Sequence, residues 1–287
     1  TMEINILFIG DVVGEPGLRI VEMLLPNFKR EYKIDFCIAN GENLADGKGI
    51  TPETAQRLFN AGVNVITTGN HVWDKLQQVK DYLIAEPNIL RPLNYPKGTY
   101  GKGYVIYNLQ NGKGKVAVVN LQGRIFLYPI DCPFRTMEMA LAKIAKETKV
   151  IIVDMHAETT AEKMAMGWYL DGRVSAVIGT HTHIPTIDAR ILPNGTGYIT
   201  DVGMTGPYDS VIGMEKRTSI LRFLYQTPHK YEVAQNDVKF SAVFLCVDSK
   251  TGKALKIENI IYPEFNRTIN EGALQNASTN NRWEENL

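Results

Sequence analysis

The first half of the chain alternates short apolar runs with amphipathic stretches, a pattern typical of α/β proteins. Three runs rich in β-branched residues are each shorter than about eight residues, so each predicts a buried strand. They cover Ile4 to Ile9, Ile34 to Ala39 and Val63 to Thr68. After the first run, apolar residues recur every four positions from Ile20 to Tyr32. This spacing predicts a helix, and Pro26 within it predicts a kink or an early end.

The second helix of this half is marked at both ends. Thr51 is suited to the N-cap, Pro52 to the first helical position and Gly62 to the residue after the end. A helix from about Pro52 to Ala61 therefore lies between two buried strands. Strands that alternate with helices in this way are joined by right-handed crossovers, so we expect a βαβαβ unit with a parallel sheet.

Beyond residue 100 the pattern favours antiparallel hairpins, because strand-like runs flank short turns that contain glycine. The predicted hairpins pair Tyr104–Leu109 with Lys115–Leu121, and Val238–Val247 with Ala254–Tyr262. Between them the pattern predicts strands at Val150–Val153 and Ser175–Ile178, and helices near Arg135–Glu147 and Glu158–Tyr169. We expect the second hairpin to belong to the sheet remote from the βαβαβ unit.

The length allows one large α/β domain or two small ones, and the composition is that of an ordinary globular protein. Because no convincing linker divides the chain, we expect a single domain over residues 1–287, with a polar tail from about residue 266. The three cysteines are odd in number and scattered, so a disulfide framework is excluded. Cys37 and Cys246 fall in strand-like apolar runs, and we expect both to be buried thiols.

The charge balance excludes a general attraction to polyanions. Lys and Arg total 31, Asp and Glu total 31, and the net charge is zero. The longest apolar run, Ala242 to Val247, is far shorter than the roughly 18 residues that a membrane helix needs. We therefore expect a cytoplasmic protein that neither enters a membrane nor binds nucleic acid stably.

Polar residues able to bind metal follow or end five of the predicted strands. These segments are Gly10-Asp11, Asn40-Gly41-Glu42-Asn43, Gly69-Asn70-His71, Asp154-Met155-His156 and Gly179-Thr180-His181-Thr182-His183. The carboxyl ends of strands in an open α/β sheet share one edge, where ligands bind. Four of the five histidines of the chain lie in these segments, whereas His229 lies outside them.

Each of these residues taken alone has a simpler explanation. Asp11 could cap a helix, Glu42 could be a solvated loop charge, and His156 could be a core histidine. Capping and turn formation do not select imidazole, however, and His181-x-His183 brings two rings within reach of one point. The conjunction therefore predicts a metal site.

The types of ligand restrict the metal chemistry. No cysteine belongs to the set, which excludes a structural zinc knuckle, and imidazole with carboxylate and amide oxygen suits Zn, Mn, Fe, Co or Ni. The candidate groups are too many for one ion. A two-metal centre, with ions about 3.5 to 4 Å apart and a bridging carboxylate, acts on phosphate esters.

The order of the motifs resembles that of the calcineurin-like metallophosphoesterases. Those enzymes usually begin with Asp-x-His and continue with Gly-Asp, whereas Val12-Val13 follows Asp11 here and the second motif is Gly41-Glu42-Asn43. Glu42 would replace the bridging aspartate, and Asn43 would take the place of the missing histidine. This variant resembles the bacterial YmdB family from about Met2 to Pro263. The motifs that carry the resemblance are Phe8-Ile9-Gly10-Asp11-Val12-Val13-Gly14, Asn40-Gly41-Glu42-Asn43, His71-Val72-Trp73-Asp74-Lys75 and Asp201-Val202-Gly203-Met204-Thr205-Gly206.

The resemblance implies an αββα sandwich, with two facing mixed sheets flanked by helices. It also implies a cytosolic phosphodiesterase that acts on cyclic nucleotides, including 2′,3′-cyclic ones, with two divalent or mixed-valence ions of iron or manganese. The implied ligands are Asp11, Glu42, Asn43 and His183 for the first ion, and Glu42, Asn70, His156 and His181 for the second. His71 would protonate the leaving group, and its alternative is a purely structural role.

Two other functions stay open. A phosphomonoesterase uses the same two-metal centre, and a nucleotide or RNA-decay regulatory protein would bind with little turnover. The complete ligand set and His71 argue against a pure binding protein, which needs neither an acid nor a metal. A homo-oligomer is compatible with the resemblance, but no feature of the sequence specifies its symmetry.

Overall fold

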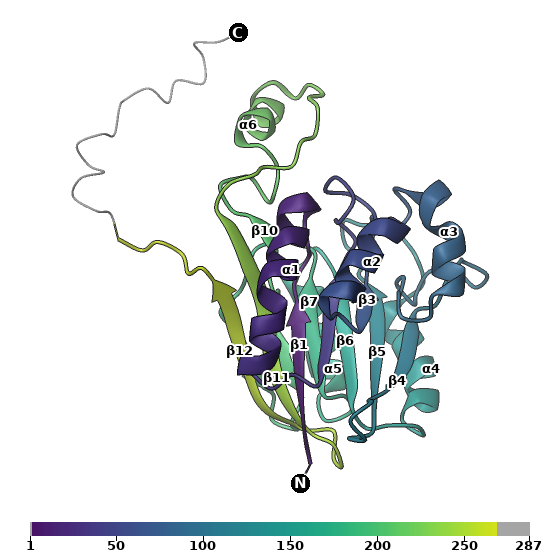
Figure 1. Ribbon diagram of the computed structural model, residues 1–287. Helices are drawn as coiled ribbons and strands as arrows, with labels where there is room; N and C mark the ends of the chain where they lie inside the picture. The colour runs from purple at the N-terminus through teal and green to yellow at the C-terminus, as the bar shows by residue number, and fades with distance from the viewer. Residues whose placement is uncertain (1, 269–287) are drawn as a thin grey trace.

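The computed structural model describes residues 2–268, which form two six-stranded sheets (Figure 1). In the first sheet, strands lie in the order β10 (Gly206–Pro207), β11 (Val238–Asp248), β1 (Glu3–Ile9), β2 (Phe36–Asn40) and β3 (Val65–Thr67), and β12 (Ala254–Tyr262) also pairs with β11. β1, β2 and β3 are parallel, whereas β11 is antiparallel to β1. The predicted parallel βαβ connections are therefore confirmed.

The second sheet is also mixed. Its strands lie in the order β4 (Tyr104–Asn108), β5 (Lys115–Gln122), β6 (Ile151–His156), β7 (Ala176–Thr180), β9 (Gly197–Ile199) and β8 (Arg190–Ile191). β5, β6, β7 and β9 are parallel, so their carboxyl ends share an edge, and β4 and β5 form the predicted antiparallel hairpin.

The two sheets pack face to face. Along β1, Ile4, Ile6 and Phe8 pack with residues of the second sheet, whereas Leu7 and Ile9 point to the opposite face. This alternation follows from the two-residue period of a strand. Both faces of β1 are therefore buried, as the continuous apolar run predicts.

Helices cover the outer faces of both sheets (Figure 1). The first sheet is covered by α1 (Gly14–Glu31), α2 (Pro52–Ala61) and α3 (Leu76–Ala85), and the second by α4 (Pro133–Ile144) and α5 (Thr160–Leu170). The predicted αββα class is thus confirmed. Thr51 caps α2, since its side chain accepts a hydrogen bond from the Thr54 amide, and Gly62 ends the helix with φ of 113°.

The early end of α1 and the placement of the second hairpin are wrong predictions. α1 continues through Pro26 to Glu31, because residues beyond the proline pack on the sheet, as Phe28 does against Phe240 at a ring-centroid distance of 4.8 Å. The kink at Pro26 stays a prediction. The second hairpin, β11–β12, belongs to the same sheet as the βαβαβ unit, since β11 pairs with β1 from Ile9 to Glu3. Most of the predicted polar tail, 269–287, lies outside the described residues.

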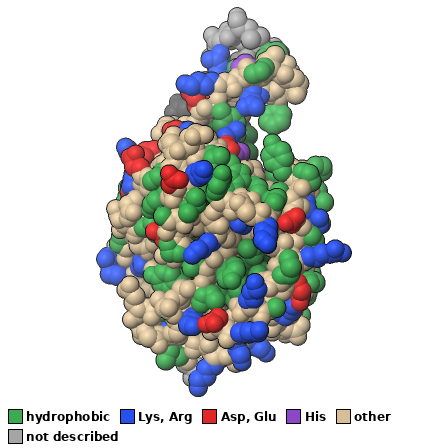
Figure 2. All heavy atoms as spheres, turned by 90° about the vertical axis from the view of Figure 1, so that its right-hand side faces the viewer, with side chains coloured by type: hydrophobic (Ala, Val, Ile, Leu, Met, Phe, Trp, Pro, Cys, Tyr) green, Lys and Arg blue, Asp and Glu red, His purple; other side chains and the backbone are tan. Residues whose placement is uncertain are grey.

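Helix α6 (Lys216–Tyr225) and its flanking loops project from the sandwich beyond the carboxyl ends of the strands (Figure 1). The face drawn in Figure 2 carries basic and acidic side chains interspersed with apolar and neutral ones. Over residues 2–268, every helix is too short or too polar to cross a membrane.

Candidate metal centre

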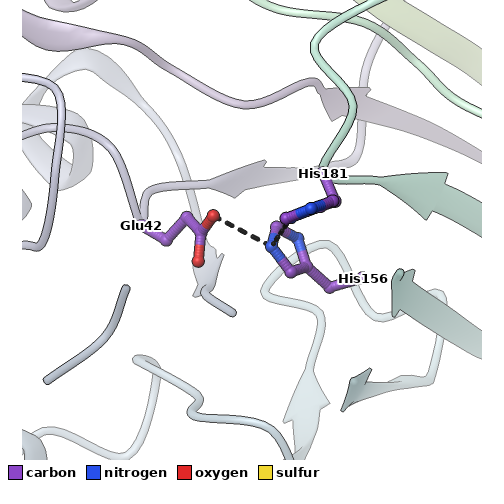
Figure 3. A group of neighbouring side chains, drawn as sticks. All are labelled: Glu42, His156 and His181. Atoms are coloured by element: carbon purple, nitrogen blue, oxygen red, sulfur yellow. Dashed lines mark hydrogen bonds and ion pairs between the residues drawn. The ribbon is translucent and has the colours of Figure 1, made fainter. Parts of the chain in front are cut away.

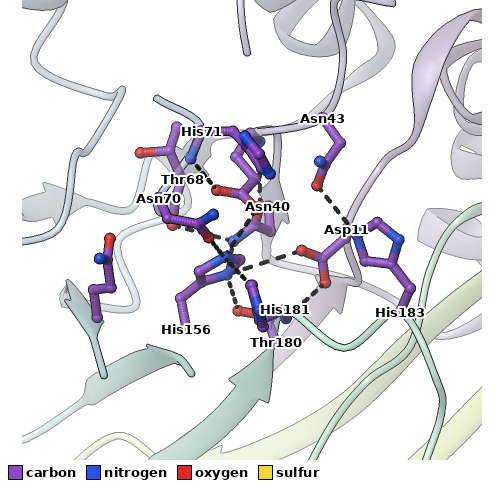
Figure 4. Close-up of polar contacts among 12 residues, drawn as sticks. Asp11, Asn40, Asn43, Thr68, Asn70, His71, His156, Thr180, His181 and His183 are labelled. Carbon is purple, nitrogen blue, oxygen red and sulfur yellow. Dashed lines mark hydrogen bonds and ion pairs between the residues drawn. The ribbon is translucent and has the colours of Figure 1, made fainter. Parts of the chain in front are cut away.

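The candidate site lies where the carboxyl ends of both sheets meet (Figure 4). Each predicted residue follows or ends a strand: Asp11 after β1, Glu42 and Asn43 after β2, Asn70 and His71 after β3, His156 at the end of β6, and His181 and His183 after β7. The structure therefore brings together side chains from five strands, as the shared edge predicts.

Three of the predicted residues converge on a ring nitrogen of a fourth, His156 Nε2. Glu42 Oε1 lies 2.9 Å and His181 Nδ1 3.1 Å from it (Figure 3). Asn70 Oδ1 lies 3.0 Å from the same nitrogen (Figure 4). One ligand atom from each of Glu42, His156 and His181 lies within 4.8 Å of the others. These four residues are the set that the resemblance assigns to the second ion.

Charge within this group displaces three pKa values. Burial alone would raise the pKa of Glu42, but attraction to His156 and a hydrogen bond from it lower that pKa to about 2. Burial alone would lower the pKa of His156, but the Glu42 carboxylate raises it to about 9. Burial and the neighbouring His156 charge lower the pKa of His181 to about 3. In the metal-free protein His156 is therefore protonated on both ring nitrogens. The proton on Nε2 lies among Glu42, His156 and His181, the three groups that could otherwise bind a cation.

The remaining predicted ligands form a second group beside the first. Asn43 Oδ1 lies 3.3 Å from His183 Nε2, while the Asn43 Nδ2 group donates to the Gly47 carbonyl at 3.0 Å and so orients the oxygen toward the site. Figure 4 shows the Asp11 carboxylate between this pair and His156. Burial raises the pKa of Asp11 to about 6.

One oxygen of Asp11 makes no hydrogen bond. Its Oδ1 is buried and has no hydrogen-bond partner among the described residues, and His156 Nδ1 lies 3.9 Å from it. A buried carboxylate oxygen without a hydrogen bond is costly, so it points to a missing partner such as a cation. This orphaned oxygen, the converging nitrogens and the amide oxygens fit transition-metal ions that accept mixed oxygen and imidazole ligands.

A hydroxyl and a buried carboxylate orient His156. Thr180 Oγ1 donates to Asp154 Oδ1 at 2.6 Å, and it lies 2.8 Å from His156 Nδ1. Because the hydroxyl hydrogen is used on Asp154, the Thr180 oxygen accepts the Nδ1 hydrogen. His156 Nε2 is then the atom that can lose its proton and bind a cation.

The two histidines after β7 are held in a sparsely populated backbone conformation. The φ angles are 104° at His181 and 69° at His183, values that cost a non-glycine residue roughly 1–3 kcal/mol each. His183 Nδ1 donates to the Ile212 carbonyl at 2.8 Å, which leaves Nε2 facing Asn43. His181 Nε2 lies 2.8 Å from Glu158 Oε2, which leaves Nδ1 facing His156.

His71 differs from the other histidines of the site. Its side chain is 27% exposed, and its Nδ1 lies 3.0 Å from Asp74 Oδ2. Its backbone amide donates to Glu42 Oε2 at 3.0 Å, which fixes the loop beside the cluster. An accessible imidazole held by a carboxylate has the position and chemistry of a proton donor.

Sequence reasoning did not assign roles to four residues that orient the site: Thr180, Asp154, Asp74 and Glu158. Asp154 carried a signal, since a charged residue inside a buried apolar strand needs partners. The spacing of three between His71 and Asp74 was another signal, because both lie in one quoted motif. The contact of Glu158 with His181 joins different segments and has no local signature.

This sandwich has the fold of the calcineurin-like metallophosphoesterases. The fold is shared with the NAD nucleotidase of Haemophilus influenzae, with a TM-score of 0.58 at 13% identity over 91% of this chain and 56% of that one. At that identity the likeness concerns the fold alone.

The chain belongs to the YmdB-like protein family, whose sequence profile matches residues 7–260. It is 51% identical over 257 residues to the 2′,3′-cyclic-nucleotide 2′-phosphodiesterase of Bacillus subtilis, covering 90% of this chain and 96% of that protein. A crystal structure described as a novel phosphatase of Mycoplasma pneumoniae has a TM-score of 0.85 at 37% identity, covering 91% of this chain and 93% of that one. The chain is therefore a phosphoesterase of this family.

Proposed function

We propose that this protein is a two-metal phosphodiesterase that hydrolyses cyclic nucleotides, with 2′,3′-cyclic nucleotides as the first substrates to test and 3′,5′-cyclic ones as the second. The observation that carries the proposal is the convergence of Glu42, Asn70 and His181 on His156 Nε2, beside a buried Asp11 oxygen that makes no hydrogen bond. The name of the Bacillus subtilis relative supports the substrate class.

The proposed ligands fall into the two groups described above. Asp11, Glu42, Asn43 and His183 hold one ion, and Glu42, Asn70, His156 and His181 hold the other. Glu42 is suited to bridging, because its carboxylate faces His156 and lies near Asp11, which it repels electrostatically. Iron or manganese as the metal, the cytoplasm as the location and a homo-oligomeric state belong to this proposal through the family resemblance.

When bound, two divalent ions supply positive charge for the phosphate and activate water as the nucleophile. The residues of this chain then have separate tasks. Glu42 and Asp11 hold negative charge at the centre, so two carboxylates against two divalent ions leave a local charge of about +2. Asp74 orients His71 through Nδ1, and His71 donates a proton to the departing oxygen.

For a 2′,3′-cyclic substrate, cleavage at the 2′ position breaks the bond between phosphorus and O2′. Water supplies the oxygen that joins phosphorus, and the 2′ oxygen leaves with the proton that His71 donates. The product is then a nucleoside 3′-phosphate. A phosphomonoesterase would instead leave the cyclic diester intact and release inorganic phosphate from a nucleoside monophosphate, and a binding protein would cleave neither substrate.

The test combines metal analysis of freshly purified protein with product analysis. We expect about two ions per chain and conversion of 2′,3′-cyclic AMP to a nucleoside monophosphate that is stopped by a chelator and restored by manganese. Faster turnover of matched monoesters than of diesters would favour the phosphomonoesterase. Tight nucleotide binding without turnover by the metal-loaded protein would favour the binding protein.

A further inference from the structure

Asp201, in the loop after β9, holds the residue between His181 and His183. Its carboxylate is almost fully buried, and its Oδ2 atom accepts hydrogen bonds from the Thr182 amide at 3.0 Å and from the Thr182 hydroxyl at 2.8 Å. Its Oδ1 atom accepts from the Gly203 amide at 2.8 Å. One carboxylate therefore fixes both the backbone and the side chain at the centre of the histidine loop.

A buried lysine forms an ion pair with the same Asp201 oxygen. Lys163 of α5 is fully buried, and its Nζ lies 2.9 Å from Asp201 Oδ2 and 3.3 Å from the Thr180 carbonyl. A buried ion pair is weak evidence for stability, because apolar residues of similar volume often stabilise a protein equally well. Lys163 instead ties Asp201 to the end of β7, where the histidine loop begins.

The same segment reaches the other sheet. The Met204 amide donates to the His183 carbonyl at 3.1 Å, and the Thr205 amide donates to the Asp11 carbonyl at 2.9 Å. Met204 and Thr205 thus donate hydrogen bonds to the backbone carbonyls of two proposed ligands that come from different sheets. The position of His183 relative to Asp11 is set by this segment.

We propose that Asp201, with Lys163 as its counter-charge, is a positioning residue that preorganises the His181–His183 loop for metal binding. The loop needs such support because His181 and His183 both have positive φ, a conformation that persists only where the surroundings hold it. Asp201 acts through Thr182 and contacts neither ring. This inference rests on the metal centre of the proposed function, and it gives a role to the motif from Asp201 to Gly206.

The test measures Mn²⁺ binding to metal-free protein by calorimetry and by the electron paramagnetic resonance of free Mn²⁺. We expect Asp201→Asn to weaken Mn²⁺ binding tenfold or more, the scale of residues that orient metal ligands. The matched control is Asp171→Asn, because Asp171 also accepts backbone hydrogen bonds, from Asn194 and Thr196, but at the amino ends of the strands. The control should bind Mn²⁺ as the wild type does.

A second pair of variants covers the case in which Asp201→Asn does not fold. Thr182→Val removes the hydroxyl at nearly constant volume, whereas Thr182→Ser keeps it. We expect Thr182→Val to weaken Mn²⁺ binding several-fold and Thr182→Ser to restore it. Circular dichroism in a chelator checks that both metal-free proteins are folded.

Folded Asp201→Asn with wild-type Mn²⁺ affinity would overturn the inference, as would equal affinities for Thr182→Val and Thr182→Ser. A merely structural role would lower the unfolding temperature and leave the affinity unchanged. The assay contains no nucleotide, so its outcome is separate from that of the proposed substrate. A wild type that binds Mn²⁺ but leaves cyclic nucleotides intact would contradict the proposed function and not this inference.

Discussion

His156 Nε2 and His181 Nδ1 face one another at 3.1 Å, although one residue ends β6 and the other follows β7. Their pKa values are displaced in opposite directions, to about 9 for His156 and to about 3 for His181. The Glu42 carboxylate favours the proton on His156, and that proton disfavours a second one on His181. The metal-free centre therefore holds a proton at the point where the proposed second ion binds.

The first prediction concerns pH. An ion that binds His156 Nε2 must displace its proton, and below about pH 9 that proton is present in the metal-free protein. Metal affinity should therefore rise with pH, by about tenfold per unit up to about pH 9, and level off above it. Mn²⁺ titrations from pH 6 to pH 8, in two buffers of different ionisation enthalpy, measure both the affinity and the protons released. A pH-independent affinity without proton release would contradict this assignment.

The second prediction concerns the bridging carboxylate. Glu42→Ala should lose both ions, because Glu42 belongs to both proposed ligand sets. Asn43→Ala should mainly weaken the first ion, since Asn43 faces only His183 among the imidazoles. Metal content per folded chain measures both effects, and Glu53→Ala, at an exposed position of α2, is the control. Full metal content in Glu42→Ala would show that the assignment is wrong.

The third prediction tests whether His71 is a general acid or a metal ligand. His71→Ala should keep its metal and lose roughly 10²- to 10⁴-fold in turnover of a substrate with a poor leaving group. An activated aryl phosphodiester needs no proton on its leaving group, so its turnover should fall much less. Asp74→Asn should show the same selectivity with a smaller loss, because it only orients the ring. Equal losses on both substrates, or loss of metal, would exclude His71 as the acid.

The fourth prediction concerns the hydroxyl behind His156. Thr180→Val should weaken metal binding about 10- to 100-fold, because Nδ1 loses the acceptor that orients the ring. Thr67→Val is a close control, since Thr67 is also buried and also donates to Asp154 but does not contact His156. Both variants should lose roughly 1–3 kcal/mol of stability, because each removes a hydrogen-bond donor from the buried Asp154 carboxylate. A similar metal affinity for the two variants would show that the hydroxyl has no orienting role.

The sequence predicts the site's location because strand ends are local features. Apolar runs mark β1, β2, β3, β6 and β7, and the polar residues at their ends then share one edge. The orienting contacts are different, because they join residues that only the tertiary structure brings together. The bond of Thr180 to Asp154 depends on the pairing and register of β6 with β7, and the bond of Asp201 to Thr182 depends on how two loops meet. No local pattern specifies either contact.

The wrong prediction for the β11–β12 hairpin also arises because local patterns do not specify tertiary contacts. The runs in β11 and β12 predict an antiparallel pair correctly, but they do not specify which sheet receives it. β11 lies beside β1, and its Phe240, Ala242 and Phe244 pack in the core under α1. Strand order thus depends on a pairing between the two ends of the described chain.

The oxygen ligands and the nitrogen ligands of the proposed centre come from different sheets. All the oxygen ligands, from Asp11 to Asn70, follow strands of the first sheet, and the three imidazoles come from the second. A bound ion would therefore cross-link the two layers at their carboxyl edge. A newly made chain whose layers have not yet packed together offers carboxylates without imidazoles, or imidazoles without carboxylates, and binds metal weakly. Metal uptake would then follow the packing of the two sheets, so that the ions bind to fully folded chains and not to partly folded ones.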